Sequence, residues 1–144
     1  MTFVLDPRLA DDTLPLGRLT LSRLLLMNDC QYPWLILVPE QPGLSELFDL
    51  AEGDRQRLMQ EIATVAAALA DVCRPSKINV GALGNIVRQL HVHVVARSDS
   101  DPAWPGPVWG KLPPSPYSED AAAHWRQRLT VAMAARESLF WPHR

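Results

Sequence analysis

Cysteine is scarce in this chain, which has only Cys30 and Cys73 and no C-x-x-C pair. A disulfide framework or a zinc knuckle needs more thiols or closer spacing, so we expect two ordinary buried thiols. The sequence also lacks any run of about 18 apolar residues, the length that crosses a membrane. Its N-terminus has neither the basic nor the apolar part of a secretory signal. The expected compartment is the cytosol, with no membrane partner.

Positive charge is also in short supply, because 14 lysines and arginines face 16 acidic residues for a net charge of −2. A protein that holds long nucleic acids by charge needs a clustered basic surface, so that class of partner is not expected. A single nucleotide or dinucleotide remains possible. At 144 residues and 47% hydrophobic content, the chain is expected to form one ordinary domain, residues 1–144, with a proper core.

What the sequence does contain is the segment Gln89–Arg97, in which two histidines alternate with aliphatic residues. Strict alternation predicts a half-buried strand, where side chains i and i+2 point the same way. Gln89, His91 and His93 then share one face, and the aliphatic residues between them face the core. Two imidazoles on one face can act as base, nucleophile or metal ligand near neutral pH. An isolated H-x-H, however, is more often two solvated histidines on the outer face of a sheet.

The segments on either side of this strand favour a binding site. Upstream, Gly81–Arg88 contains two glycines and Asn85, which predict a turn whose backbone can approach a phosphate closely. Downstream, Asp101–Gly110 is a loop stiffened by proline that carries Trp104 and Trp109. Such a loop is a candidate lid or a contact with a neighbouring subunit, and capping of the core is the equal alternative.

Periodicity and turn signals also predict the remaining elements. The expected order is a helical turn over 7–11 followed by loop to Gly17, strands over 18–28 and 34–38, a helix over 53–73, a strand over 77–80, the histidine strand, and a helix over 119–139. The strands over 18–28 and 34–38 are expected to pair as an antiparallel hairpin, since a short turn separates them. The helix over 53–73 has one apolar stripe and should lie across a face of the sheet.

Taken together, these segments resemble the histidine-triad (HIT) family, whose signature is H-φ-H-φ-H-φ-φ with φ hydrophobic. Gln89–Val95 fits it everywhere but the first position, and a second match is a strand ending in Asn28 followed by a strand ending in Pro39. The resemblance runs from about Arg18 to Arg97. It implies a small α+β domain with an antiparallel sheet of about five strands, one long central helix and a C-terminal helix, usually in a homodimer.

The resemblance also implies an activity and a set of site residues. His91 matches the nucleophile that takes a nucleoside monophosphate from the α-phosphate, and His93 matches the histidine that contacts the phosphate. Asn28 corresponds to a ribose contact, and Asn85 falls in the turn that supplies polar contacts to the phosphates. Gln89 replaces the first histidine; it can form hydrogen bonds there but cannot titrate.

The implied reaction is hydrolysis or transfer of nucleotidyl groups through a nucleotidyl-histidine intermediate. Expected substrates are dinucleoside polyphosphates, nucleoside phosphoramidates and related adenylylated compounds. The histidine mechanism needs no metal and no cofactor.

Three alternatives remain open from the sequence. A nucleotide-binding module with weak catalysis would explain Gln89. A metal enzyme would use His91 and His93 as ligands, with Asp99 or Asp101 as the nearest candidates for a third. A structural or partner-binding role would rest on the tryptophan loop alone.

Overall fold

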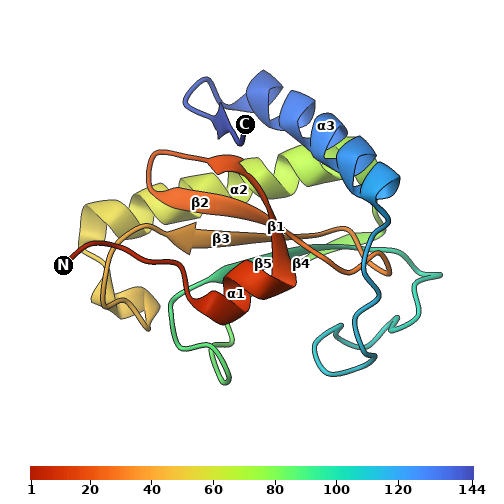
Figure 1. Ribbon diagram of the computed structural model, residues 1–144, viewed down its shortest axis with the longest axis horizontal. Helices are drawn as coiled ribbons and strands as arrows, with labels where there is room; N and C mark the ends of the chain where they lie inside the picture. The colour runs from red at the N-terminus through yellow and green to blue at the C-terminus, as the bar shows by residue number, and fades with distance from the viewer.

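The computed structural model describes all residues 1–144 and has a six-stranded antiparallel sheet (Figure 1). The strand order is β4-β5-β3-β2-β1-β6. The strands are β1 (Thr13–Arg18), β2 (Ser22–Met27), β3 (Trp34–Pro39), β4 (Lys77–Gly81), β5 (Val92–Arg97) and β6 (Trp141–Pro142). The helices are α1 (Pro7–Asp12), α2 (Glu52–Cys73), α3 (Glu119–Arg136) and the single 3₁₀ turn η1 (Leu47–Asp49). The predicted α+β class with a long central helix and a C-terminal helix is confirmed.

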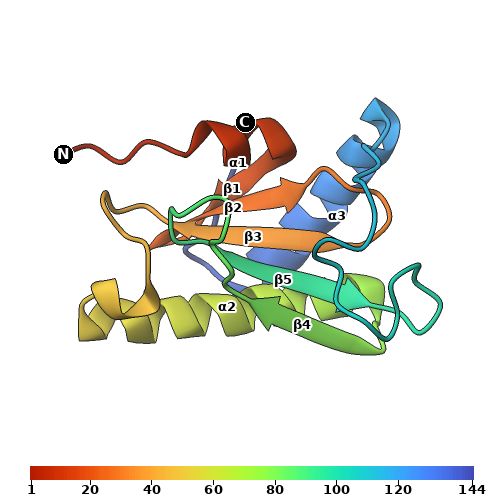
Figure 2. The same ribbon diagram turned by 90° about the horizontal axis from the view of Figure 1, so that it is seen from below.

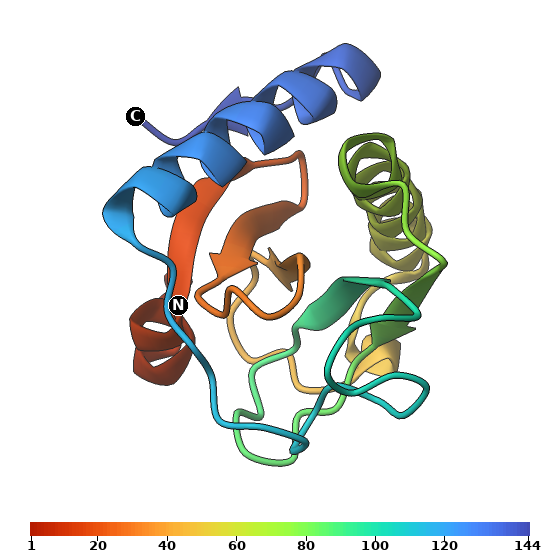
Figure 3. The same cartoon turned by 90° about the vertical axis from the view of Figure 1, so that its right-hand side faces the viewer.

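Two apolar cores lie on the two faces of this sheet. Figure 3 shows α2 and α3 on one side, and α1 with the loops that follow β4 and β5 on the other. Figure 2 shows α2 running along β5 and β4. The larger core contains Val92 and Val94 of β5, and the smaller core contains Val95, so alternation along β5 places its side chains in both.

The predicted apolar stripe on α2 is confirmed. Leu58, Ile62, Val65 and Leu69 are buried in the larger core, as their spacing of three and four residues requires. The helix ends where Arg74 adopts the left-handed conformation, with φ of 47°. No helix of the structure has both the length and the hydrophobicity needed to cross a membrane.

The N-terminal half of the sheet differs from the sequence prediction. The loop expected before Gly17 is wrong, because Thr13–Arg18 forms β1. The strand expected over 18–28 is also wrong at its start, because the chain turns after β1 and β2 begins only at Ser22. Pro15 and a register shift between Pro15 and Gly17 interrupt the alternation that would reveal β1 in the sequence.

The sheet has a sixth strand because the C-terminal residues of the chain return to β1. Trp141 and Pro142 pair with Arg18 and Gly17. Gly17 permits this close approach: a Cβ atom there would lie 2.5 Å from the Phe140 ring and 2.6 Å from the Trp141 carbonyl oxygen. Glycine at this position is therefore a packing requirement of β6.

Smaller differences concern element ends and the cysteines. The histidine strand begins at Val92 instead of Gln89, and α3 ends at Arg136 instead of Leu139. The prediction of two buried thiols is wrong for Cys30, which is exposed in the turn between β2 and β3. Cys73 is partly buried, and burial raises its thiol pKa to about 11.

Candidate active site

His91 and His93 line the same cavity, which has a volume of about 450 Å³. Its walls come from α1, the start of β3, the turn before Gln89 and the loop that carries Trp109. A second cavity of about 470 Å³ shares Met27, Trp34 and other lining residues with the first, so the two form one groove. Ligand sites in proteins usually measure about 300–1,000 Å³. The groove therefore has room for a small molecule that places one part in each cavity.

The sequence prediction that both imidazoles share one face is confirmed. Their ring centroids are 4.8 Å apart and their planes are inclined at 67°. Each residue is only 6% exposed, which excludes two solvated histidines on an outer face. His91 lies just before β5 and His93 lies within it, so the extended backbone continues through both.

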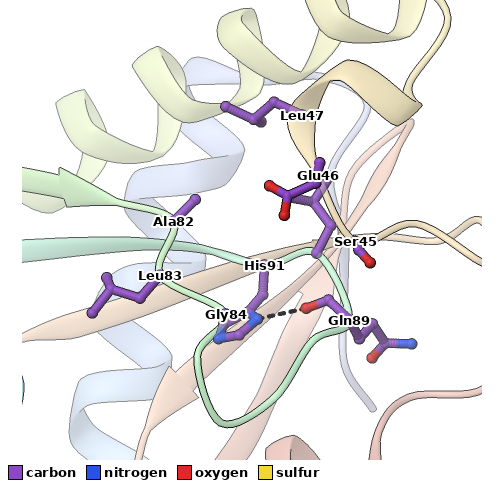
Figure 4. Close-up of a pocket in the computed structure, with 9 residues that line it drawn as sticks. Ser45, Glu46, Leu47, Ala82, Leu83, Gly84, Gln89 and His91 are labelled. Carbon is purple, nitrogen blue, oxygen red and sulfur yellow. Dashed lines mark hydrogen bonds between the residues drawn. The ribbon is translucent and has the colours of Figure 1, made fainter.

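The imidazole of His91 is held in one tautomer by the backbone. Its Nδ1 lies 2.7 Å from the Gln89 carbonyl oxygen, as the dashed line in Figure 4 shows. A carbonyl only accepts hydrogen bonds, so Nδ1 carries the proton in this pair. In the neutral ring, Nε2 then holds the free lone pair. This arrangement leaves His91 with a nucleophilic nitrogen that has a fixed orientation.

His93 is held in the opposite tautomer. The indole Nε1–H of Trp34 donates to His93 Nδ1 at 3.0 Å. Because an indole nitrogen only donates, Nδ1 must accept, and the ring proton belongs on Nε2. Burial, and secondarily the neighbouring His91, lower the pKa of His93 to about 3. His93 is therefore a neutral hydrogen-bond donor at physiological pH.

Two tryptophans enclose the His93 ring. The centroid of Trp34 lies 5.6 Å from it and that of Trp109 lies 5.5 Å away, both inclined to the imidazole. These packed rings restrict how far His93 can rotate. Trp109 comes from the loop that the sequence singles out. The contact of Trp34 is missed by sequence reasoning, because it depends on β3 pairing with β5.

A buried ion pair organises the tryptophan loop. The guanidinium of Arg97 donates to both carboxylate oxygens of Asp101, at 2.7 and 3.0 Å, and Arg97 is only 1% exposed. Asp101 also accepts from the backbone N–H groups of Ala103 and Trp104. Trp104 packs over Arg97, with its ring centroid 5.6 Å from the guanidinium carbon. Of the two loop tryptophans, only Trp109 reaches the cavity.

This ion pair also weakens the metal-enzyme alternative. Hydrogen bonding to Arg97 holds the pKa of Asp101 below its usual value, and both carboxylate oxygens are already engaged. Asp99 is exposed. No group of three or more histidine, cysteine or carboxylate side chains is close enough to hold a metal ion. The third ligand that the sequence offered is not brought to the histidines.

The three other predicted site residues have different surroundings. Asn85 is exposed in the turn and lines the histidine cavity. Asn28 lines the second cavity, and its Oδ1 accepts from the Tyr117 backbone N–H at 2.9 Å. That bond leaves the Asn28 Nδ2 donors available to a ligand.

Gln89 uses its side chain elsewhere. Its Nε2 donates to the Val4 carbonyl at 2.9 Å, and its Oε1 accepts from the Asp6 N–H at 2.9 Å. Figure 4 shows the Gln89 amide pointing away from the His91 ring, beside a smaller cavity of about 60 Å³. The predicted contact between Gln89 and a phosphate stays a prediction. Sequence reasoning missed the contact with the N-terminal segment and the place of Arg8 and Asp12 in the cavity wall.

Comparisons with known proteins agree on one family. A family model described as the HIT domain matches residues 11–100. A histidine-triad protein from Marinobacter aquaeolei is 43% identical, with a TM-score of 0.92, and the match covers 95% of this chain and 100% of that one. Those from Sinorhizobium meliloti and Bradyrhizobium japonicum are 48% and 41% identical, with TM-scores of 0.89 and 0.90. These two matches cover 91% and 92% of this chain, and 97% and 99% of the others. Among curated proteins, none matches the chain.

Proposed function

The chain belongs to the histidine-triad family, and from that premise we propose that it hydrolyses or transfers nucleotidyl groups with His91 as the nucleophile. Family membership supports the binding of small nucleotides. The single observation that carries the catalytic proposal is the pairing of His91 Nδ1 with the Gln89 carbonyl at 2.7 Å. That bond directs the lone pair of Nε2 away from the backbone, as a nucleophile requires.

In the first step of the proposed reaction, His91 Nε2 attacks the α-phosphorus of the substrate. A P–N bond forms, the bond from phosphorus to the leaving group breaks, and the leaving group takes a proton from solvent. The imidazole becomes positively charged, and the Gln89 carbonyl stabilises it through the Nδ1–H. His93 Nε2–H donates to a phosphate oxygen, where negative charge collects.

In the second step, water attacks the same phosphorus atom. The P–N bond breaks, nucleoside monophosphate leaves, the water proton goes to solvent and His91 is regenerated. Dividing one difficult displacement into two easier ones is the benefit of a covalent intermediate. When an alcohol or amine replaces water, the same step is a transfer.

The groove is large enough for a nucleotide that occupies both of its cavities. We propose that the reacting phosphate lies between His91 and His93, where Asn85 also lines the wall. The nucleoside then extends into the second cavity, where Asn28 Nδ2 can donate to a ribose hydroxyl. Gln89 contributes through its backbone carbonyl oxygen, which orients the His91 ring. Dinucleoside polyphosphates and nucleoside phosphoramidates are the proposed substrate classes.

The test is turnover of a dinucleoside polyphosphate and of a nucleoside phosphoramidate by the wild type and by His91→Asn. We expect wild-type release of nucleoside monophosphate and, after rapid quenching, a nucleotidyl adduct on His91 detected by mass spectrometry. His91→Asn keeps a side chain of similar polarity but has no nucleophilic nitrogen, so it should bind nucleotide without forming the adduct. Equal turnover by both proteins would overturn the proposal.

A nucleotide-binding module with little turnover is the second candidate. The observation that favours it is Gln89, which stands where the family motif has its first histidine. Tight nucleotide binding without any His91-dependent release of monophosphate would select this candidate. The single domain over residues 1–144, the homodimer and the cytosolic location stay predictions.

A further inference from the structure

The segment Phe3–Asp12, which we call the N-terminal wall, is tied to Gln89, two residues before His91. Both polar atoms of the Gln89 amide bond to its backbone, at Val4 and Asp6, across 85 and 83 positions of sequence. A glutamine amide can donate and accept hydrogen bonds at the same time, whereas a hydrocarbon side chain can do neither. Gln89 therefore acts as a two-point clamp on the wall.

Other contacts fix the part of the wall that follows the clamp. Leu9 is buried in the smaller core, which also contains Tyr32 and Trp34. The Asp6 carboxylate caps α1 by accepting from the Arg8 N–H at 2.8 Å, and the Thr13 hydroxyl donates to the Leu9 carbonyl at 2.6 Å. A short helix held by a buried side chain and a cap has a defined position. The wall is thus part of the folded groove.

Arg8 is the residue of the N-terminal wall that faces the two histidines. It lines the cavity that contains His91 and His93, and no other lysine or arginine does so. Its guanidinium forms no hydrogen bond or ion pair within the protein, although four other arginines do form ion pairs. The cavity has one carboxylate, from Asp12. A free guanidinium matches the geometry of phosphate oxygens, which it can bind through two parallel N–H groups.

We propose that the N-terminal wall is a substrate-binding element in which Arg8 binds a non-reacting phosphate group of the nucleotide and Gln89 holds Arg8 in place. This rests on the proposed function, since it assumes that the reacting phosphate lies at His91. The wall begins before residue 11, where the match to the family model begins. Arg8 therefore lies outside the part of the chain that the family model matches. Arg8 acts on the ligand, and Gln89 is a positioning residue.

Isothermal titration with adenosine, AMP and ADP tests the role of Arg8, with guanosine, GMP and GDP as a parallel series. In the wild type, ADP should bind more tightly than adenosine. Arg8→Gln should weaken ADP binding about five- to tenfold and leave adenosine binding unchanged, because Arg8 is exposed and its charged hydrogen bonds are only partly desolvated. Arg8→Lys should keep part of the ADP affinity. Arg57→Gln, which removes an exposed arginine from α2, is the matched control and should change nothing.

The role of Gln89 is tested with Gln89→Met, which keeps the length of the side chain and removes both clamp bonds. Hydrogen exchange at the Asp6 amide should become faster, because that N–H loses its acceptor. ADP binding should weaken in the same direction as in Arg8→Gln. The double variant should bind ADP no more weakly than Arg8→Gln alone, since both changes act through one guanidinium. Unchanged exchange protection in β5 will show that the fold is intact.

The possible results separate the two proposals. If the wild type binds none of these ligands, the proposed function fails and the inference about the wall fails with it. If the wild type binds them and His91 forms an adduct, but Arg8→Gln keeps the wild-type ratio of ADP to adenosine affinity, only the role of Arg8 is overturned. An additive double variant, or unchanged exchange at Asp6, overturns the role of Gln89.

Discussion

The indole nitrogen of Trp34 donates a hydrogen bond of 3.0 Å to Nδ1 of His93. This contact fixes the proton of His93 on Nε2, so that the ring presents a donor to the groove. The Gln89 carbonyl fixes the opposite tautomer at His91. The Nε2 atom of His91 thus presents a lone pair, whereas the Nε2–H of His93 presents a hydrogen-bond donor.

Trp34→Phe removes this donor and keeps an aromatic ring in the same place. We expect His93 to populate both neutral tautomers and kcat to fall about three- to tenfold, as the loss of a hydrogen bond worth about 1 kcal/mol predicts. Nitrogen NMR of the His93 ring measures the tautomer directly, and steady-state kinetics gives kcat. Trp141→Phe, at an exposed tryptophan of β6, is the control. An unchanged tautomer ratio in Trp34→Phe would contradict the assignment.

The periodic elements of this fold can be predicted from the sequence. The apolar stripe on α2 and the alternation around His93 are local patterns, and each identifies its element without knowledge of the partners. β1 cannot be predicted in this way, because Pro15 and the register shift break the alternation. Its strand character comes from pairing with β2 on one side and β6 on the other.

In the candidate site, too, local patterns can be predicted from the sequence and contacts between remote segments cannot. Both histidines and Asn85 lie within nine consecutive residues, 85–93, so a motif can reveal them. The partners that orient the site are remote: Trp34 meets His93 across 59 positions, and Gln89 meets Asp6 across 83. Nothing in the residue types or their spacing indicates these pairs. They are set by strand pairing and by the path of the N-terminal segment.

Stability should fall in acid because of His93. Its pKa is lowered from 6.5 in a solvated histidine to about 3 in the folded protein, so the unfolded chain binds this proton first. The contribution of the neutral His93 to stability is fully present above pH 6.5 and is lost as the pH falls toward 3, with a total on the order of 5 kcal/mol. Denaturant unfolding of the wild type and of His93→Asn between pH 7 and pH 4 measures it. The wild type should lose more stability over this range, and parallel pH profiles would rule the contribution out.

Asp101→Asn should destabilise the protein strongly. Its partner Arg97 is almost fully buried, and removing one member of a buried ion pair leaves the other charge uncompensated, at a cost of about 3–5 kcal/mol. Urea unfolding followed by tryptophan fluorescence measures the stability. The matched control is Asp71→Asn, because Asp71 pairs with Arg136 and their side chains are 51% and 43% exposed. That change should cost less than about 1 kcal/mol.

Gly17→Ala should detach β6 from the sheet. The added Cβ would lie 2.5 Å from Phe140 and 2.6 Å from the Trp141 backbone oxygen, so the last strand must move away or β1 must distort. Overpacking of this kind costs about 1–3 kcal/mol. Hydrogen exchange at the His143 amide, which donates to the Leu16 carbonyl at 3.0 Å, should become faster while exchange in β5 stays slow. Gly53→Ala provides the control, because a Cβ there meets nothing within 4 Å. If His143 stays protected and the stability is unchanged in Gly17→Ala, the requirement for glycine at this position is wrong.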